Sequence, residues 1–252
     1  MSDVVGIQAV RSALRSAPEL ARCLYVQKGR RDARMNELIG MARDADVRFQ
    51  TVESAWFKRR VTDGEAHQGV VLEQRAVELP SEEDLFGTFE HWTSPKTILV
   101  LDGVTDPRNL GACLRTANGA GAQAVVVPKR KSATLNAAAL KTAQGGQDGV
   151  MVVEVTNLAR FLKRLKDANV WLIGTDGEAT EPHYLTDLKG DVAIVMGAEG
   201  TGLRRLTREL CDYVVHIPMA GSVESLNVSV ATGVVLYERL RQLSEAAKSS
   251  VD

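Results

Sequence analysis

Polar residues that could do chemistry lie in two glycine-rich segments near the carboxyl end of the sequence. Glu199 lies two residues after Gly197 in the first segment, and Ser225 and Asn227 follow Gly221 in the second. Glycine lets the backbone approach a ligand closely, so both segments could bind one through main-chain groups. The glycines match neither the dinucleotide-binding pattern nor the P-loop, and the Gly-x-Ser-x-Gly nucleophile elbow is absent. A dinucleotide, nucleoside triphosphate or acyl-transfer site is therefore disfavoured.

Two further candidates lie upstream: Asn109 near the start of a predicted helix, and Arg115 further along the same helix. The planar fork of a guanidinium suits a phosphate group and can also stabilise negative charge that develops on an alkoxide. Ordinary structural roles are open to most of these residues: a helix cap for Asn109 or Ser225, a solvated charge for Arg115, and a turn carboxylate for Glu199.

Asn227 is harder to explain by local structure. The pattern predicts a closing helix that begins near Glu224 or Ser225 and runs through Leu240. Asn227 would lie inside this helix, where asparagine competes for backbone hydrogen bonds. Its position therefore favours a role in a site.

Alternating strands and helices must position these residues. Apolar runs predict strands at 98–101, 124–127, 150–155, 170–173, 193–196 and 214–217, with helices at 110–120, 135–143 and after Asn157. This alternation predicts an α/β fold whose parallel sheet is covered on both faces. Ligands bind at the carboxyl edge of such a sheet.

Six residues lie at or just beyond the predicted strand ends, where their backbone groups could hold a ligand. They are Gly174, Thr175, Gly197, Ile217, Met219 and Leu226. The side chains of Ile217 and Leu226 are also ordinary core residues, so a binding role for these two would use the backbone.

Three stretches together resemble the SPOUT superfamily of RNA methyltransferases, and within it the TrmH-like ribose 2′-O-methyltransferases. They read LDGVTDPRNLGACLRTANGAGA, MGAEGTGL and IPMAGSVESLNVSVATG. The run RRLTRE and the uninterrupted SLNVSVATG are most similar to the subgroup that methylates one guanosine ribose in bacterial large-subunit ribosomal RNA. The agreement of three separated motifs in order and spacing makes this resemblance specific, and it covers essentially the whole chain.

The resemblance implies S-adenosylmethionine as methyl donor, no metal, and a homodimer with its active site near the interface. It also implies a trefoil knot, which periodicity does not indicate, since knots are rare. Among the residues above, it assigns Gly197, Ile217 and Leu226 to the cofactor. Asn109, Arg115, Glu199, Ser225 and Asn227 become the catalytic candidates, with Arg115 at the reacting 2′-hydroxyl and its neighbouring phosphate. One stretch, Ala143 to Asp148, departs from the family pattern A-x-G-A-x-E, which predicts a looser backbone at Gly146.

The first domain is expected at residues 1–74, as a small α/β unit that resembles the family's substrate-binding domain. Its basic residues form two clusters, at 28–34 and at 58–60, which could be a solvated face. Trp56 and Phe57 lie beside the second cluster and favour RNA contact. The predicted RNA-binding residues are Lys28, Arg30, Arg31, Arg34, Lys58, Arg59 and Arg60. His67 resembles a family signature in Ala66-His67-Gln68-Gly69 and would otherwise be structural.

The remaining boundaries follow from composition. Residues 75–95 are acidic and rich in turn-forming residues, which indicates a linker; 96–245 would be the methyltransferase domain and 246–252 a tail. The net charge of −1 permits an RNA partner without requiring one. Cys23, Cys113 and Cys211 are far apart, which favours reduced thiols. With no signal peptide or membrane-length apolar run, a cytoplasmic protein is expected.

Two alternatives remain open on the sequence. One is a transfer-RNA ribose 2′-O-methyltransferase, against which the first domain argues. The other is a non-catalytic RNA-binding or ribosome-assembly factor, against which the intact set of candidate residues argues.

Overall fold

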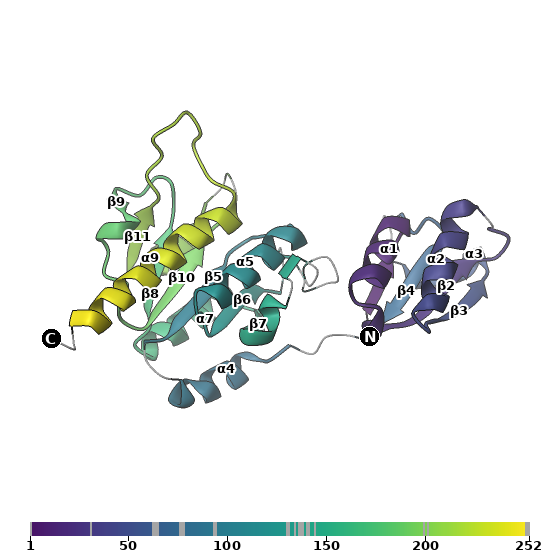
Figure 1. Cartoon of the computed structure of the whole chain (residues 1–252), viewed down its shortest axis with the longest axis horizontal. Helices are drawn as coiled ribbons and strands as arrows, with labels where there is room; N and C mark the ends of the chain where they lie inside the picture. The colour runs from purple at the N-terminus through teal and green to yellow at the C-terminus, as the bar shows by residue number, and fades with distance from the viewer. Residues whose placement is uncertain are drawn as a thin grey trace. The chain divides into compact units, whose positions relative to one another are not determined.

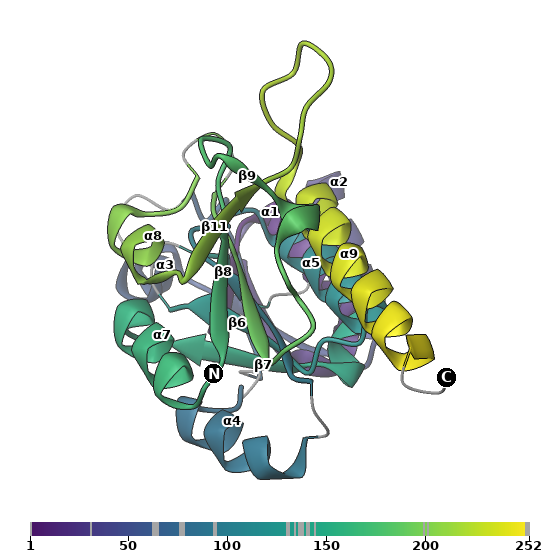
Figure 2. The same cartoon turned by 90° about the vertical axis from the view of Figure 1, so that its left-hand side faces the viewer.

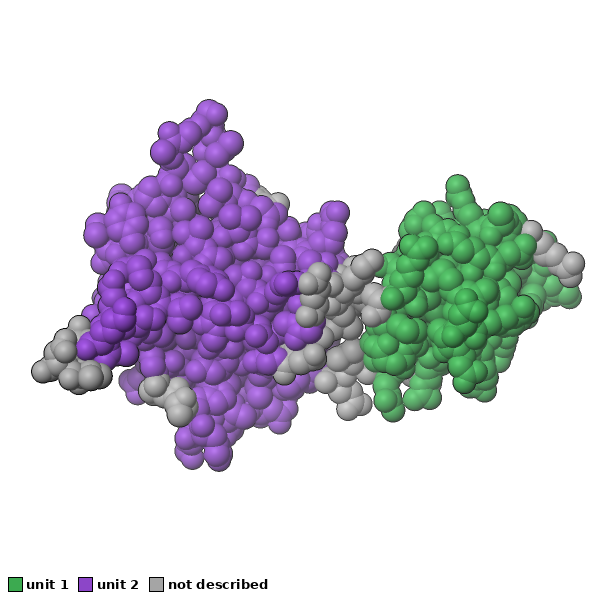
Figure 3. Space-filling model, in the orientation of Figure 1, with its two compact units in different colours: residues 1–78, 136–141 green, residues 79–135, 142–252 purple. Residues whose placement is uncertain are grey.

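The computed structural model describes residues 2–30, 32–61, 66–75, 79–92, 95–129, 132–133, 135, 139, 142–143, 145–198, 200 and 202–249. The chain divides into two compact units (Figure 3). The first comprises residues 1–78 and the second residues 79–135 and 142–252, with residues 136–141 assigned to the first. Each unit has its own hydrophobic core.

The first unit is a four-stranded sheet in the order β1-β4-β2-β3. The strands are β1 (Ser2–Val5), β2 (Ala21–Gln27), β3 (Arg48–Val52) and β4 (Val70–Gln74), and only β2 and β3 are parallel. The helices are α1 (Ile7–Ser16), α2 (Ala33–Asp44) and α3 (Ser54–Arg60), with a 3-10 turn η1 at Pro18–Leu20. These strands and helices form the small α/β unit that the sequence predicts.

The second unit is built on a seven-stranded parallel sheet in the order β7-β6-β5-β10-β8-β11-β9. The strands are β5 (Thr97–Leu101), β6 (Ala124–Pro128), β7 (Met151–Val155), β8 (Trp171–Thr175), β9 (Glu181–Pro182), β10 (Val192–Met196) and β11 (Tyr213–His216). All five residues of β5, β6 and β10 are buried, as expected for strands covered on both faces. The predicted parallel α/β fold is confirmed.

Helices cover both faces of this sheet (Figure 2). α5 (Pro107–Gly119) and α9 (Val228–Ser249) lie on one face, and α7 (Leu158–Asp167) and α8 (Arg205–Leu210) lie on the other. Its described residues also form the 3-10 turns η2 (Phe89–His91), η3 (Gly146–Gly149) and η4 (His183–Leu185). The helix predicted over 135–143 falls mostly outside the described residues, and the trefoil knot stays a prediction.

The segment predicted as a linker contains a helix, α4 (Glu82–Thr88), which belongs to the second unit. Ser81 and Asp84 form a capping box at its start. Leu85 is fully buried in the same core as Phe161 and Leu162 of α7. The acidic run is thus not merely a solvated spacer, because part of it packs on the sheet unit.

A buried arginine fixes α9 against the sheet. Arg239 is 1% exposed, and its Nε donates to Thr97 Oγ1 at 2.8 Å while its Nη2 donates to the carbonyl of Lys96 at 2.8 Å. Nη1 donates to the carbonyls of Leu188 and of Gly190, the latter at 3.0 Å. Burial lowers the pKa of Arg239 to about 10. These hydrogen bonds hold the middle of α9 against the first residue of β5. Because α9 is a continuous helix, they also help to position its first turn.

A long exposed segment joins β11 to α9 and projects from the second unit (Figure 1). Residues 220–225 are all exposed. No helix among the described residues is long and apolar enough to cross a membrane.

Candidate active site

The start of α5 is capped by Asp106, not by Asn109. The Asp106 carboxylate accepts a hydrogen bond from the backbone of Arg108 at 2.8 Å, and Pro107 is the first helical residue. The Arg108 side chain bonds the same carboxylate and lowers the pKa of Asp106. The alternative role of Asn109 as a helix cap is therefore excluded, since Asn109 lies inside the first turn.

Asn227 also differs from expectation, because α9 begins at Val228 and not near Glu224 or Ser225. Asn227 Oδ1 accepts hydrogen bonds from the backbone of Ser229 at 3.0 Å and from its hydroxyl at 2.5 Å. Asn227 thus sits at the cap position of α9, and this cap is the local structural reason for an asparagine here that the predicted helix did not provide.

The amide of Asn227 makes a second contact that no cap requires. Its Nδ2 donates to Asn109 Oδ1 at 3.0 Å, across 118 residues of sequence. The two helix starts therefore meet, and two of the predicted catalytic residues touch. This juxtaposition is the strongest geometric support for a site at this edge.

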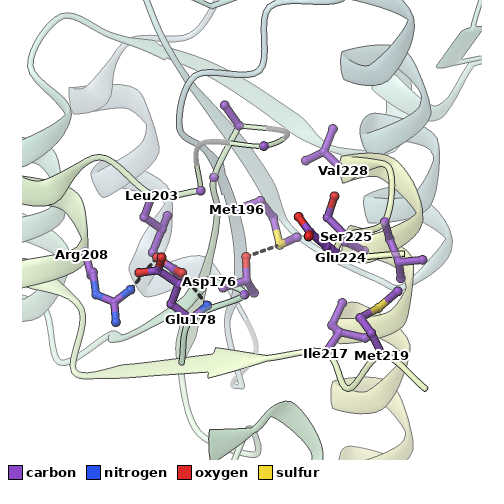
Figure 4. Close-up of a pocket in the computed structure, with 18 of the residues that line it drawn as sticks. Asp176, Glu178, Met196, Leu203, Arg208, Ile217, Met219, Glu224, Ser225 and Val228 are labelled. Atoms are coloured by element: carbon purple, nitrogen blue, oxygen red, sulfur yellow. Dashed lines mark hydrogen bonds and ion pairs between the residues drawn. The ribbon is translucent and has the colours of Figure 1, made fainter. Parts of the chain in front are cut away.

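A cavity of about 770 Å³ opens at the carboxyl edge of the sheet (Figure 4). It lies where the ends of β8, β10 and β11 meet the segment before α9. Six of the predicted site residues line it: Thr175, Gly197, Ile217, Met219, Ser225 and Leu226. Strand ends and a helix start meet in space, as the parallel-sheet argument predicts.

Other predicted residues lie apart from this lining. Gly174 is buried beneath it, where an added Cβ would lie 2.7 Å from Leu203 Cδ1 and 2.8 Å from Cys211 Sγ. Asn109, Asn227 and Arg115 are not among the lining residues, and Arg115 is an exposed residue of α5. Glu199 is outside the described residues.

The two glycine-rich segments differ in their need for glycine. At Gly197 an added Cβ would lie 2.2 Å from the carbonyl carbon of Gly202 and 2.5 Å from the nitrogen of Leu203. Only glycine allows this close return of the loop. At Gly221 no protein atom lies within 4 Å of an added Cβ, so the fold itself does not require glycine there.

Gly146 is the point at which the departing stretch supports α5. A Cβ added there would lie 2.6 Å from Arg115 Cα, and Asn118 Nδ2 donates to the Gly146 carbonyl at 3.0 Å. The expectation of a looser backbone at Gly146 is wrong, because this glycine packs directly on the helix turn that carries Arg115.

Sequence reasoning missed several lining residues. Asp176 and Arg208 form an ion pair in the wall at 2.6 Å, and Met196 and Leu203 supply apolar surface. Asp176 had a signal, since it follows Thr175 directly at a strand end. Arg208 lies in the run RRLTRE, but its helix α8 was not predicted, so nothing in the sequence placed its side chain at the cavity.

In the first unit, Arg60 belongs to a network within the fold. Its guanidinium pairs with Asp3 at 2.6 Å and with Glu73 at 2.8 Å. It also lies over the rings of Tyr25 and Trp56, at 5.2 and 5.1 Å from their centroids. Arg60 therefore holds the sheet edge and offers less to an RNA than its position suggests.

The other predicted RNA-binding residues fall into two groups. Lys28 pairs with Glu53 at 2.7 Å, and Arg30 pairs with Asp32 at 2.7 Å and bonds the carbonyl of Gln68. Arg34, Lys58 and Arg59 are exposed, and Arg31 is outside the described residues.

The aromatic residues near the second cluster are mostly engaged. Trp56 stacks on Tyr25 at 4.4 Å, and Phe57 is fully buried and stacks on His67 at 4.7 Å. Phe57 is therefore not free for a base, contrary to expectation. His67 accepts a hydrogen bond from the backbone of Gly69 at 3.0 Å, which gives it a structural role.

The geometry defines a class of protein: a parallel α/β domain with a cavity at the carboxyl edge of its sheet, preceded in the sequence by a small mixed domain. Residues 96–237 match the SpoU rRNA Methylase family, and residues 4–80 match the family described as RNA 2'-O ribose methyltransferase substrate binding.

Curated relatives agree with these family matches. The chain is 50% identical over 241 residues to the 23S rRNA (guanosine-2'-O-)-methyltransferase RlmB of Haemophilus influenzae, covering 95% of this chain and 97% of that protein. It is 46% identical to the enzyme of that name from Escherichia coli strain K12, over 97% of this chain and 100% of the relative. The crystal structure of the SpoU methyltransferase AviRb from Streptomyces viridochromogenes shares the fold, with a TM-score of 0.62 and 24% identity over 97% of this chain and 90% of that one. The chain belongs to the SpoU rRNA methylase family.

Proposed function

We propose that the protein transfers a methyl group from S-adenosylmethionine to the ribose 2′-hydroxyl of a guanosine in bacterial large-subunit (23S) ribosomal RNA. The contact between Asn109 and Asn227, at the edge of the sheet that carries the cavity, is the observation on which the proposal rests. The choice of substrate follows the names of relatives that match both units of the chain, which are 23S rRNA (guanosine-2'-O-)-methyltransferases.

The cavity fits a nucleoside cofactor. Its volume of about 770 Å³ lies in the range of small-molecule sites, and its walls combine apolar side chains with a few polar groups. The loop returns so close to Gly197 that no side chain fits there, so at this position the protein can offer a ligand only backbone groups. When bound, S-adenosylmethionine supplies an already activated methyl group, so the displacement requires no metal.

Arg115 is the residue that we assign to the RNA. A guanidinium keeps its positive charge in proteins, so its fork suits the phosphate beside the target ribose and the alkoxide that develops on the 2′-oxygen. Asn109 and Asn227 orient the same ribose. Glu199 and Ser225 remain candidates for orienting Arg115 or accepting a substrate proton.

A homodimer would complete this arrangement. On α9, Val230 and Tyr237 are 52% and 51% exposed, and Leu240 is 37% exposed. An exposed apolar stripe of this kind marks an interaction surface. We propose that a second copy covers it, with the active site close to the interface. Sedimentation velocity tests the dimer, and Tyr237→Glu should shift it to monomer.

The first unit is proposed to bind the RNA through Arg34, Lys58 and Arg59, the exposed members of the basic set. Lys58→Gln with Arg59→Gln should reduce the slope of log K against log salt by about two. Cofactor affinity should not change. An unchanged slope would mean that these side chains form only a solvated face.

A methylation assay separates the candidate functions. Unmodified 23S ribosomal RNA and transfer-RNA transcripts are incubated with the protein and S-adenosylmethionine, digested, and searched for 2′-O-methylguanosine by mass spectrometry. We expect product in the 23S transcript only, and a loss of about 100-fold or more in single-turnover rate for Asn227→Ala. Methylated transfer RNA would establish the first alternative, and binding of RNA without product the second. Because its proposed substrate is ribosomal RNA, the protein is proposed to be cytoplasmic.

A further inference from the structure

One wall of the cavity carries a charged pair that the proposed reaction does not use. Asp176 follows β8 directly, and Arg208 of α8 lies beside it in the same wall. Ile217 and Met219 lie on the opposite side of the cavity (Figure 4). The side chain of Asp176 is 11% exposed and that of Arg208 is 38% exposed. The other carboxylates in the described lining, Glu178 and Glu224, belong to exposed residues.

The Asp176 carboxylate is held in one position. Arg208 Nη1 donates to its Oδ2 at 2.6 Å, and the backbone of Glu178 donates to its Oδ1 at 3.0 Å. The backbone nitrogen of Asp176 donates to the Val215 carbonyl at 2.9 Å, which pins the residue to β11. An acceptor fixed from several sides is suited to recognising a ligand without rearrangement.

The chemistry of this acceptor selects its partner. A carboxylate only accepts hydrogen bonds, and its two oxygens offer about four lone-pair sites. Hydrogen bonds from the residues that the structure describes use two of them. S-adenosylmethionine has two kinds of strong donor, the ribose hydroxyls and the α-ammonium group. With the guanidinium of Arg208 2.6 Å from Oδ2, a second cation would be repelled and the carboxylate charge is already balanced. Neutral hydroxyls fit this position better than an ammonium does.

We infer that Asp176 accepts hydrogen bonds from the ribose hydroxyls of the cofactor, and that Arg208 is a positioning residue which holds the carboxylate. The inference rests on the proposed function, because it concerns the same cavity. It gives the cavity a selective contact to the sugar, whereas backbone contacts at Gly197 and Ile217 would serve the rest of the nucleoside.

Calorimetry with two ligands tests this inference. The ligands are S-adenosylhomocysteine and its analogue that lacks both ribose hydroxyls. Wild-type protein should bind the analogue ~10- to 100-fold more weakly, as expected for losing hydrogen bonds to a charged acceptor. Asp176→Asn should bind S-adenosylhomocysteine ~10-fold or more weakly than wild type, yet show little further loss with the analogue. Asp187→Asn, the same change at an exposed residue away from the cavity, should behave as wild type.

The positioning role of Arg208 has its own readout. Arg208→Gln should weaken only the ligand that has ribose hydroxyls, and Arg208→Lys should restore part of that loss. A structural role would weaken both ligands equally, and that result would overturn the inference. Equal affinity of wild type for the two ligands would overturn it as well, whether or not the variants fold. If wild type binds neither ligand, the proposed cofactor itself is wrong; if it binds both equally, only the role of Asp176 is.

Discussion

Removing α4 should destabilise the methyltransferase unit, although its sequence predicts a linker. Leu85 is fully buried in the core beside Phe161 and Leu162. Replacing a buried leucine with alanine costs about 2–5 kcal/mol, and a domain of this kind has about 5–15 kcal/mol in total. Leu85→Ala alone should therefore remove a large part of the unfolding free energy of a fragment spanning residues 79–252.

The charged residues of α4 provide a matched pair of variants. Glu82 has a side chain 7% exposed and pairs with Arg160 and Arg164, both at 3.1 Å. Its neighbour Glu83 is 76% exposed and pairs only with Arg164 among the described contacts, at 3.2 Å. Glu83→Ala should cost no more than about 1 kcal/mol, as for surface pairs, whereas Glu82→Ala should cost clearly more, because it removes the buried partner of two guanidinium groups.

Urea unfolding followed by circular dichroism measures these differences. The fragment 79–252, its Leu85→Ala, Glu82→Ala and Glu83→Ala variants, and a shorter fragment 94–252 are compared. We expect the shorter fragment to unfold at much lower urea or to aggregate, since its core cluster around Phe161 would be exposed. If fragments 79–252 and 94–252 unfold at the same urea concentration, α4 is only a linker and the packing argument fails.

Three further changes test other parts of the molecule. Gly197→Ala should weaken S-adenosylmethionine binding ~10-fold or more in calorimetry, because its Cβ would overlap the returning loop, while Gly221→Ala should have no effect; equal effects would refute the loop argument. Arg115→Lys should stay impaired in single-turnover methylation at every pH if the planar fork matters, and recovery at high pH would instead support a base role. Burial and a hydrogen bond to a carboxylate raise the pKa of Tyr25 to about 12, so the stability that its neutral phenol contributes should be full below pH 10 and lost between pH 10 and 12. Thermal melts of wild type and Tyr25→Phe across this range should converge as pH rises; parallel curves would exclude this cause.

The sequence was sufficient for the features that depend on local pattern. Apolar runs placed the central strands, and the end of each run placed Thr175, Gly197 and Ile217 at the edge where the cavity lies. Backbone groups at strand ends need no particular side-chain partner, so their position follows from the strand alone. The starts of helices were harder to predict, because a cap is defined by a single hydrogen bond. The sequence pattern put Asn227 inside the last helix, whereas in the structure α9 begins at Val228 and Asn227 caps it.

The sequence could not show which charged residues are buried, and the physical reason is the same for each of them. A pattern assigns charges to solvent, because burying an unpaired charge is costly; the assignment fails when a partner distant in sequence compensates the charge. Arg239 finds carbonyl groups from two separate segments, and Glu82 finds arginines 78 and 82 residues away. Asp176 finds Arg208 across 32 residues, in the wall of the cavity itself. The first two contacts stabilise the fold, whereas the third leaves acceptor capacity beside the space for a ligand. A buried charged group whose hydrogen-bonding capacity is fully used by the protein stabilises the fold. A buried carboxylate at a cavity that can still accept hydrogen bonds is instead a candidate for ligand recognition.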